Sequence, residues 1–140
     1  MLFRSANFIE TQIMRAGWYG STVATLSREY KRIIKHYLDL SGTSEAVDYK
    51  LVNFGARGAS SRETAYIGGL AHLVNFKTTD NILGVLATMQ YYGATLENIT
   101  GVTIPASEHS VTTERGRDGE EEFFSDAIDT FLVTPGAPIS

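Results

Sequence analysis

The sequence predicts an α/β protein in which N-terminal helices precede about three βα units with a parallel sheet, part of an incomplete β/α barrel. Apolar residues recur at intervals of three and four over residues 22–40, the spacing of an amphipathic helix. After residue 48, short β-rich runs alternate with helical patterns, as in parallel α/β folds. The chain has 140 residues, whereas a closed β/α barrel takes about 250. We therefore expect a single partial α/β domain over residues 1–140, with a helical lead-in over 1–48 and βα units over 49–140.

Two helices are predicted in the lead-in. Residues 6–16 carry a short apolar stripe that Gly17 interrupts, and residues 18–20 join it to the helix over 22–40. Gly42 follows as a C-terminal stop.

Three runs are predicted to be strands, at residues 49–54, 71–76 and 102–106. Each run is followed by a loop and a helical pattern, so the strands are expected to be parallel. Ligands bind at the carboxyl ends of such strands. The polar residues that follow each run are therefore candidate site residues.

Each predicted strand is followed by a helix with its own start signal. The first helix begins at a capping box formed by Ser60 and Glu63. The second covers about residues 79–92, with Gly93 as its stop. The third begins at the acidic run from Asp118, because carboxylates favour the positive end of a helix dipole.

Composition excludes several classes of function. The chain has no cysteine, which excludes disulfide frameworks, thiolate metal sites and cysteine nucleophiles. Twelve Lys and Arg against 16 Asp and Glu give a charge of −4, so no general attraction to nucleic acid is expected. No apolar run reaches the roughly 18 residues of a membrane helix, and no signal peptide is recognisable. The sequence therefore predicts a cytoplasmic protein without nucleic-acid or membrane partners.

The first predicted strand runs into Phe54-Gly55-Ala56-Arg57-Gly58. An aromatic face beside an arginine suits a flat heterocycle next to a phosphate, and the flanking glycines allow close backbone approach. An equally good interpretation of this segment is that Phe54 belongs to the core and Arg57 is an ordinary surface charge. The segment lacks the third glycine of a dinucleotide fingerprint and the Gly-Lys-Ser/Thr ending of a P-loop.

Two further candidates follow the other predicted strands. Asp80 opens a helix, so it is either the cap of that helix or an acceptor for an amide or hydroxyl of a ligand. His109 follows Glu108 in a loop, where an imidazole can carry a proton or a phosphoryl group. Most loop histidines have no such role. His72, inside a predicted strand, is interpreted as structural.

Neither a metal site nor a strong anion site emerges from the remaining residues. The three histidines have no metal-ligand spacing, so no metal ligand is assigned. A basic helix face could bind anions, although a solvated face is the simpler interpretation; it comprises Arg28, Lys31, Arg32, Lys35 and His36.

Several motifs occur in an order and spacing that are specific in combination: Thr22-Val23-Ala24-Thr25, Ser27-Arg28-Glu29, Tyr49-Lys50-Leu51, Phe54-Gly55-x-Arg57-Gly58, the run from Ala71 to Lys77, Asp80, and the run from Pro105 to Ser110. Together these motifs resemble the central part of the nicotinamide phosphoribosyltransferase family, whose members are type II phosphoribosyltransferases. The resemblance covers about residues 7–131.

The resemblance implies a dimeric enzyme that joins nicotinamide to phosphoribosyl pyrophosphate, giving nicotinamide mononucleotide and pyrophosphate in NAD salvage. It implies that Phe54 stacks on the nicotinamide ring, that Arg57 contacts the bound nucleotide, and that Asp80 accepts from the carboxamide. It also implies that His109 is phosphorylated from ATP, an activator, and that Mg²⁺ accompanies phosphoribosyl pyrophosphate. None of these cofactors is expected to be held by this chain alone.

Three positions depart from the family pattern: Asn53 replaces the usual Asp, Ala56 a common aromatic, and Thr78 a usual Gly. The family's chain also extends well beyond both ends of the matching segment. We therefore expect a fragment, inactive alone, that works as a homodimer or with complementing fragments. The alternatives are a noncatalytic remnant or binding and interaction module, and a nicotinate phosphoribosyltransferase-like variant.

Overall fold

A computed structural model describes residues 5–98, 100–104 and 106–132. The chain divides into two compact units, residues 1–103 and residues 104–140, which we call the first and the second unit. Each unit is described by itself below.

The first unit begins with one long helix, α1 (Ala6–Ser41), of 36 residues. The predicted break at Gly17 is wrong, because a single glycine costs a helix only about 1 kcal/mol. Gly20 has a packing role instead, since a Cβ there would lie 3.2 Å from Cγ2 of Ile67. The predicted stop is confirmed: Gly42 caps the helix with φ 79° in the left-handed region.

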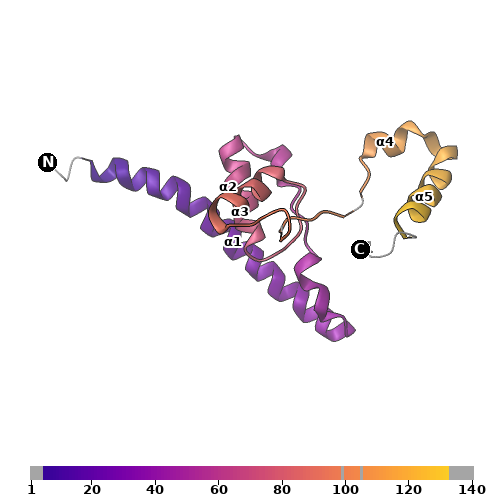
Figure 1. Cartoon of the computed structure of the whole chain (residues 1–140), viewed down its shortest axis with the longest axis horizontal. Coiled ribbons are helices and arrows are strands. Elements are labelled where there is room, and N and C mark those ends of the chain that lie inside the picture. The colour runs from indigo at the N-terminus through magenta and orange to yellow at the C-terminus, as the bar shows by residue number, and fades with distance from the viewer. Residues whose placement is uncertain (1–4, 99, 105, 133–140) are drawn as a thin grey trace. The chain divides into compact units, whose positions relative to one another are not determined.

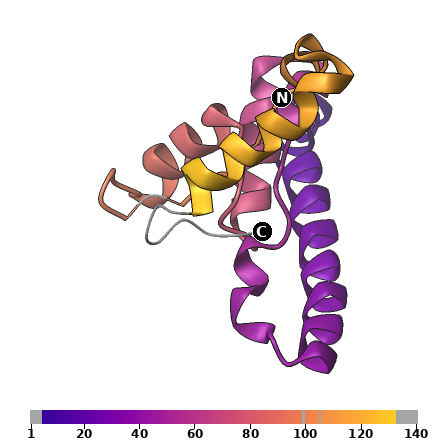
Figure 2. The same ribbon diagram turned by 90° about the vertical axis from the view of Figure 1, so that its right-hand side faces the viewer.

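A 3₁₀ turn, η2 (Ser44–Tyr49), returns alongside the C-terminal end of α1, as Figure 2 shows. An ion pair fixes this return: Nζ of Lys31 lies 2.6 Å from Oδ1 of Asp48 and donates to the carbonyl of Asn75 at 2.6 Å. The hydrogen bond from Lys31 holds the pKa of Asp48 below its ordinary value, against the opposing effect of partial burial.

A second short turn, η3 (Gly55–Gly58), leads into α2 (Arg62–Leu73). The N-cap of α2 is Ser61, whose Oγ accepts from the backbone N–H of Thr64. The predicted capping box at Ser60 is therefore displaced by one residue. Glu63 instead pairs with Arg15 of α1.

The next helix, α3 (Ile82–Tyr92), crosses α2 at a pair of glycines. A Cβ at Gly69 would lie 2.7 Å from Cα of Gly84, so the two backbones are in direct contact. The predicted C-terminal stop is confirmed, with Gly93 at φ 66°. Figure 1 shows α2 at the middle of α1, and α3 packs on α2. The core of this unit contains Ala65, Ala71, Leu73, Phe76, Val85 and Ala87.

The predicted parallel sheet of βα units is wrong. The described residues contain no β-strand; they contain two isolated parallel bridges, Asn53 with Thr79 and Thr78 with Val102. The described chain is predominantly helical. It is therefore a helical fragment in which three extended segments touch at single residues.

The main error lies in residues 71–76, where α2 continues to Leu73. Ala71, His72 and Leu73 are all buried, so this end of the helix has no solvent-exposed face that would reveal a helical period. A short buried helix end cannot be distinguished from a buried strand by periodicity. The other two runs, residues 49–54 and 102–106, include one bridge residue each, Asn53 and Val102.

The second unit contains α4 (His109–Glu114) and α5 (Gly116–Leu132). The predicted third helix is confirmed as α5, with Asp118 in its first turn. Gly116 separates the two helices with φ 69°.

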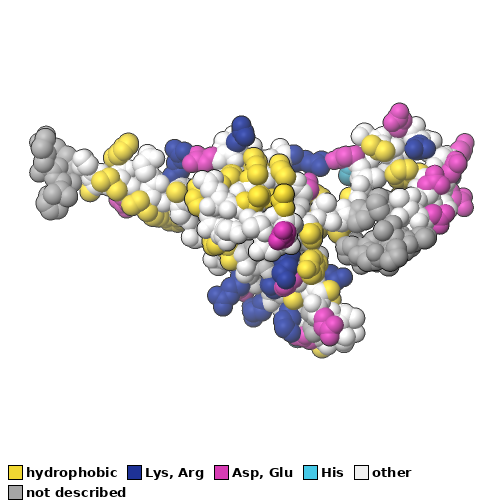
Figure 3. All heavy atoms as spheres, viewed as in Figure 1, with side chains coloured by type: hydrophobic (Ala, Val, Ile, Leu, Met, Phe, Trp, Pro, Cys, Tyr) yellow, Lys and Arg dark blue, Asp and Glu magenta, His cyan; other side chains and the backbone are white. Residues whose placement is uncertain are grey.

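Large apolar side chains are exposed on the first unit. Figure 3 shows them along the N-terminal part of α1 and over α2 and α3. Further along α1, a stripe at helical spacing is 49–72% exposed; it comprises Leu26, Tyr30, Ile33, Tyr37 and Leu40. Exposed apolar area of this extent is typical of surfaces that another polypeptide covers.

Candidate functional site

The two segments that carry Phe54 and Asp80 are joined through their backbones. Asn53 forms a parallel bridge with Thr79. The N–H of Asp80 donates to the carbonyl of Asn53 at 3.2 Å, and Oγ1 of Thr79 donates to the same carbonyl at 3.1 Å. Phe54 and Asp80 directly follow the bridged residues Asn53 and Thr79, so their backbones lie close together.

Phe54 and Arg57 lie on the exposed side of this junction. The Phe54 residue is 45% exposed, which excludes the core interpretation. Arg57 lies in η3 and is exposed. Oδ1 of Asn53 accepts from the N–H of Gly55 at 2.8 Å, which fixes the turn between them. Asn53 thus supplies a side-chain acceptor oxygen here, as the aspartate of the family pattern could.

Asp80 does not cap α3. The side chain of Asn81 accepts from the N–H of Leu83 at 3.1 Å and is the N-cap of that helix. Asp80 is exposed. The capping interpretation of Asp80 is therefore wrong, which leaves ligand binding as the interpretation still open for its carboxylate. An Asn directly before the helical pattern was the sequence signal for this cap.

Thr78 fills the position where the family pattern has glycine. It is 1% exposed, and its Oγ1 donates to the carbonyl of Leu51 at 2.7 Å. This hydrogen bond adds a second link between the segments before Phe54 and before Asp80. The departure therefore strengthens the junction.

His72 links the same two segments, the one before Phe54 and the one before Asp80. Its Nε2 lies 3.1 Å from the carbonyl oxygen of Leu51 and 3.0 Å from that of Thr78. Its ring stacks on Phe76 with 5.2 Å between centroids. It is 5% exposed. Burial lowers the pKa of His72, although the two carbonyls partly oppose this. The imidazole is structural, as the sequence predicts, but belongs to a helix.

This burial makes stability depend on pH. An unfolded histidine titrates near pH 6.5, whereas His72 in the folded chain takes up its proton only at lower pH. The free energy of unfolding should therefore fall as pH drops from about 7.5 to about 5.5, by at most roughly 1.4 kcal/mol per pH unit. Urea titrations at both of these pH values measure the difference in the free energy of unfolding. His72→Gln keeps an N–H donor and should lose most of the difference.

The exposed His36 of α1 provides the matched control, because His36→Gln leaves the buried imidazole in place. Equal pH dependence in wild type and His72→Gln would show that burial of His72 does not control stability in this range.

His109 is the first residue of α4, in the second unit. Its side chain is fully exposed, and its Nδ1 lies 4.0 Å from the carboxylate of Glu108. Because the two units are described separately, its role beside Phe54, Arg57 and Asp80 stays a prediction.

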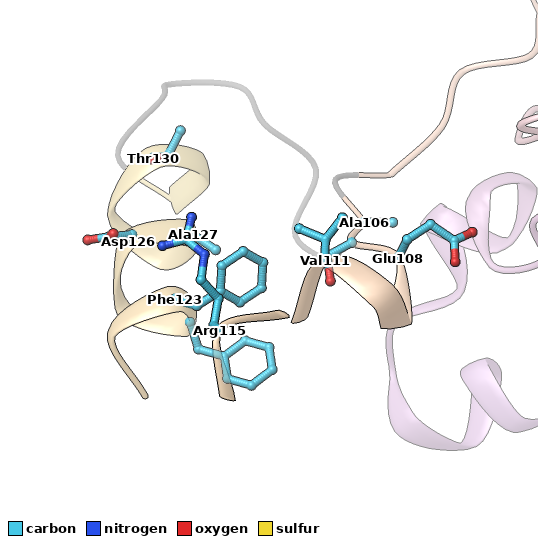
Figure 4. A pocket seen from close by; sticks show the side chains of 10 residues that line it. Ala106, Glu108, Val111, Arg115, Phe123, Asp126, Ala127 and Thr130 are labelled. Atoms are coloured by element: carbon cyan, nitrogen blue, oxygen red, sulfur yellow. The ribbon is translucent and has the colours of Figure 1, made fainter. Parts of the chain in front are cut away.

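The second unit has a hollow of about 650 Å³ between α4 and α5, shown in Figure 4. The Arg115 guanidinium lies 5.7 Å from the ring centroid of Phe123 at this hollow. Val111 and Phe124 complete its apolar wall. None of these residues was predicted from the sequence to belong to a site.

The basic face of α1 is largely neutralised. Lys31 pairs with Asp48, Arg32 with Glu29 at 3.0 Å, and Lys35 with Asp39 at 2.8 Å, the last two within the helix. Three of the five predicted basic residues are thus in ion pairs, which favours the solvated-face interpretation over anion binding.

The described residues contain no group of three or more His, Asp or Glu side chains arranged to hold a metal ion. Within the same residues, no helix combines the length and apolar character needed to cross a membrane.

Comparison with known proteins agrees with the resemblance. The sequence model of the nicotinate phosphoribosyltransferase (NAPRTase) family matches residues 49–135. A nicotinamide phosphoribosyltransferase of Xanthomonas campestris pv. campestris is 37% identical over 136 residues, which is 96% of this chain and 28% of that protein. The nicotinamide phosphoribosyltransferase of Acinetobacter baylyi is 37% identical over 123 residues, or 87% of this chain and 24% of that protein.

A more distant relative, the nicotinamide phosphoribosyltransferase of Mycoplasma pneumoniae, is 29% identical over 126 residues, 89% of this chain and 25% of that protein. The chain thus spans about a quarter of the length of these relatives. Since the family model covers more than half of the sequence, the chain belongs to the nicotinate phosphoribosyltransferase (NAPRTase) family.

Proposed function

We propose that the chain supplies the base-recognition part of an enzyme that transfers the phosphoribosyl group of phosphoribosyl pyrophosphate to nicotinamide, giving nicotinamide mononucleotide and pyrophosphate. The names of the relatives support the reaction. The observation that carries the proposal is the hydrogen bond from the N–H of Asp80 to the carbonyl of Asn53, because it sets Asp80 beside the start of the Phe54 turn.

The side chains at this junction have the chemistry that nicotinamide requires. The exposed ring of Phe54 can stack on the pyridine ring, and the guanidinium of Arg57 suits the phosphate of the bound nucleotide. The carboxylate of Asp80 can accept a hydrogen bond from the carboxamide NH₂. It would repel the carboxylate of nicotinate, so one residue selects between the two substrates.

The reaction forms a bond between the ring nitrogen of nicotinamide and C1 of the ribose, while the bond from C1 to the pyrophosphate oxygen breaks. Positive charge develops on the ribosyl group in the transition state. Holding the ring nitrogen against C1 is therefore the main contribution expected of Phe54, Arg57 and Asp80.

We assign His109 the role of the phosphoryl acceptor when ATP activates the enzyme. Its fully exposed imidazole is accessible to a nucleotide, as such a role requires. Phosphorylation would transfer the γ-phosphoryl group of ATP to a ring nitrogen with release of ADP.

The chain would work with other polypeptide, either complementing segments of the same enzyme or a second copy. It spans about a quarter of the relatives, and the exposed stripe on α1 is apolar surface of the kind that such a partner covers. By itself the chain would be inactive, because it corresponds to only about a quarter of those relatives.

The experiment is complementation. The chain is co-expressed with the flanking segments of the Xanthomonas campestris relative, the complex is purified, and formation of nicotinamide mononucleotide is measured. Turnover by the complex, and by neither part alone, is the expected result. A verified complex that binds nicotinamide without turnover would establish the alternative, a noncatalytic binding module. Turnover with nicotinate in preference to nicotinamide would establish the other alternative.

A further inference from the structure

The side chain and the backbone N–H of Asn81, the residue after Asp80, form hydrogen bonds with three separate groups. Its Oδ1 accepts from the N–H of Leu83 at 3.1 Å, and its Nδ2 donates to the carbonyl of Ala65 in α2 at 2.7 Å. Its backbone N–H donates to Oγ1 of Thr79 at 3.0 Å. The first bond caps α3, but the second does not, so capping alone does not explain the residue.

The amide of Asn81 sits in the crossing of α2 and α3. A Cβ at Gly69 would lie 2.5 Å from its Nδ2, so the space around the amide is filled. Asn81 is 3% exposed. A buried amide must keep its hydrogen bonds, because each unpaired polar group costs about 1–3 kcal/mol. Asn81 therefore has one position, defined by two helices.

Asp80 is fixed on both sides as a result. On one side its own N–H donates to the carbonyl of Asn53, the residue before Phe54. On the other side the chain is anchored through Asn81 to Ala65 and Leu83. The backbone from which the exposed Asp80 side chain projects is thus set relative to the Phe54 turn.

We propose that Asn81 is a positioning residue that fixes the Asp80 carboxylate for recognition of the carboxamide. This rests on the function proposed above. Because Asn81 takes over the cap of α3, the carboxylate of Asp80 is not consumed by capping. Because Asn81 also forms a hydrogen bond with α2, the loop from Thr79 to Asn81 is held in a fixed position relative to α2 and α3.

Aspartate and serine separate the two tasks of Asn81. The variant Asn81→Asp keeps an acceptor for Leu83 but places an oxygen against the carbonyl of Ala65, where the donor was. The variant Asn81→Ser keeps a short cap hydroxyl and does not reach Ala65. Serine avoids a buried carboxylate and serves if the aspartate variant does not fold.

The first test is amide hydrogen exchange of the full 140-residue chain by NMR, which requires no ligand. We expect Asn81→Ser to lower the protection of the Asp80 amide about tenfold beyond any change in global stability. Ser61→Ala is the matched control: it removes the cap of α2, and should lower protection at Thr64 while leaving Asp80 unchanged. Wild-type protection of Asp80 in a folded Asn81 variant would overturn the proposal.

The second test is substrate preference in the complemented enzyme. The ratio of kcat/KM for nicotinamide to that for nicotinate should fall about tenfold in Asn81→Ser. Asp80→Ser in the same enzyme separates the two hypotheses. If Asp80→Ser lowers the ratio and Asn81→Ser does not, the positioning role is refuted and the proposed function stands. If neither variant changes the ratio, base recognition by Asp80 itself is refuted.

Discussion

Replacing Gly69 with alanine is expected to destabilise the first unit by about 2 kcal/mol, because the added methyl group overpacks a filled crossing. Its Cβ would lie 2.5 Å from Nδ2 of Asn81 and 2.7 Å from Cα of Gly84. Cα of Gly84 is a backbone atom, and the buried Asn81 amide is held by its hydrogen bonds to Ala65 and Leu83, so α2 and α3 must separate. Urea unfolding followed by circular dichroism measures the change.

Gly17 is the matched control for this prediction. It also lies within a helix, α1, but a Cβ there would meet nothing within 4 Å. Gly17→Ala should therefore stabilise the chain by up to about 1 kcal/mol through helix propensity. Equal effects of the two substitutions would contradict the close approach of α2 and α3.

Replacing Asp80 with serine in the complemented enzyme is expected to lower the preference for nicotinamide over nicotinate at least about tenfold, or roughly 1.4 kcal/mol. The substitution removes the acceptor for the carboxamide and, at the same time, the charge that repels nicotinate. Steady-state kinetics with each substrate measure the preference.

Asp129 of α5 provides a matched control, since it is an exposed aspartate of the second unit that has no proposed role. Asp129→Ser should leave the preference at its wild-type value. An unchanged preference in Asp80→Ser would refute the role given to Asp80.

The helix ends that depend on glycine could be predicted from the sequence. Gly42 and Gly93 both end helices in the left-handed conformation, as the positions after the apolar patterns indicate. Gly17 and Gly20 carry the same letter but lie within α1. Glycine marks a helix end only where the apolar pattern also ends, and here the pattern continues on both sides.

The strands could not be predicted correctly because their evidence was local composition. Residues 71–73 show no alternation of exposed and buried positions, because they are the buried end of α2. A sheet depends on partners far along the chain, and in the described residues the segments meet only at single bridges. The local sequence alone indicates neither whether a sheet forms nor where single bridges form.

The candidate site was predicted in part for a related reason. Phe54 was selected at the end of one predicted strand and Asp80 after the next; the strands do not form, but the bridge from Asn53 to Thr79 keeps the two backbones adjacent. The role of Asn81 was missed, because its bond to the carbonyl of Ala65 depends on how α2 and α3 cross.

In the proposed function, Phe54 and Asp80 together hold one nicotinamide ring. A crystal structure of the complemented enzyme with nicotinamide bound tests it most directly. We expect the pyridine ring to stack on Phe54, with the carboxamide nitrogen about 2.7–3.2 Å from an oxygen of Asp80. A ring bound away from Phe54, or a carboxamide whose nitrogen faces a group other than Asp80, would contradict it.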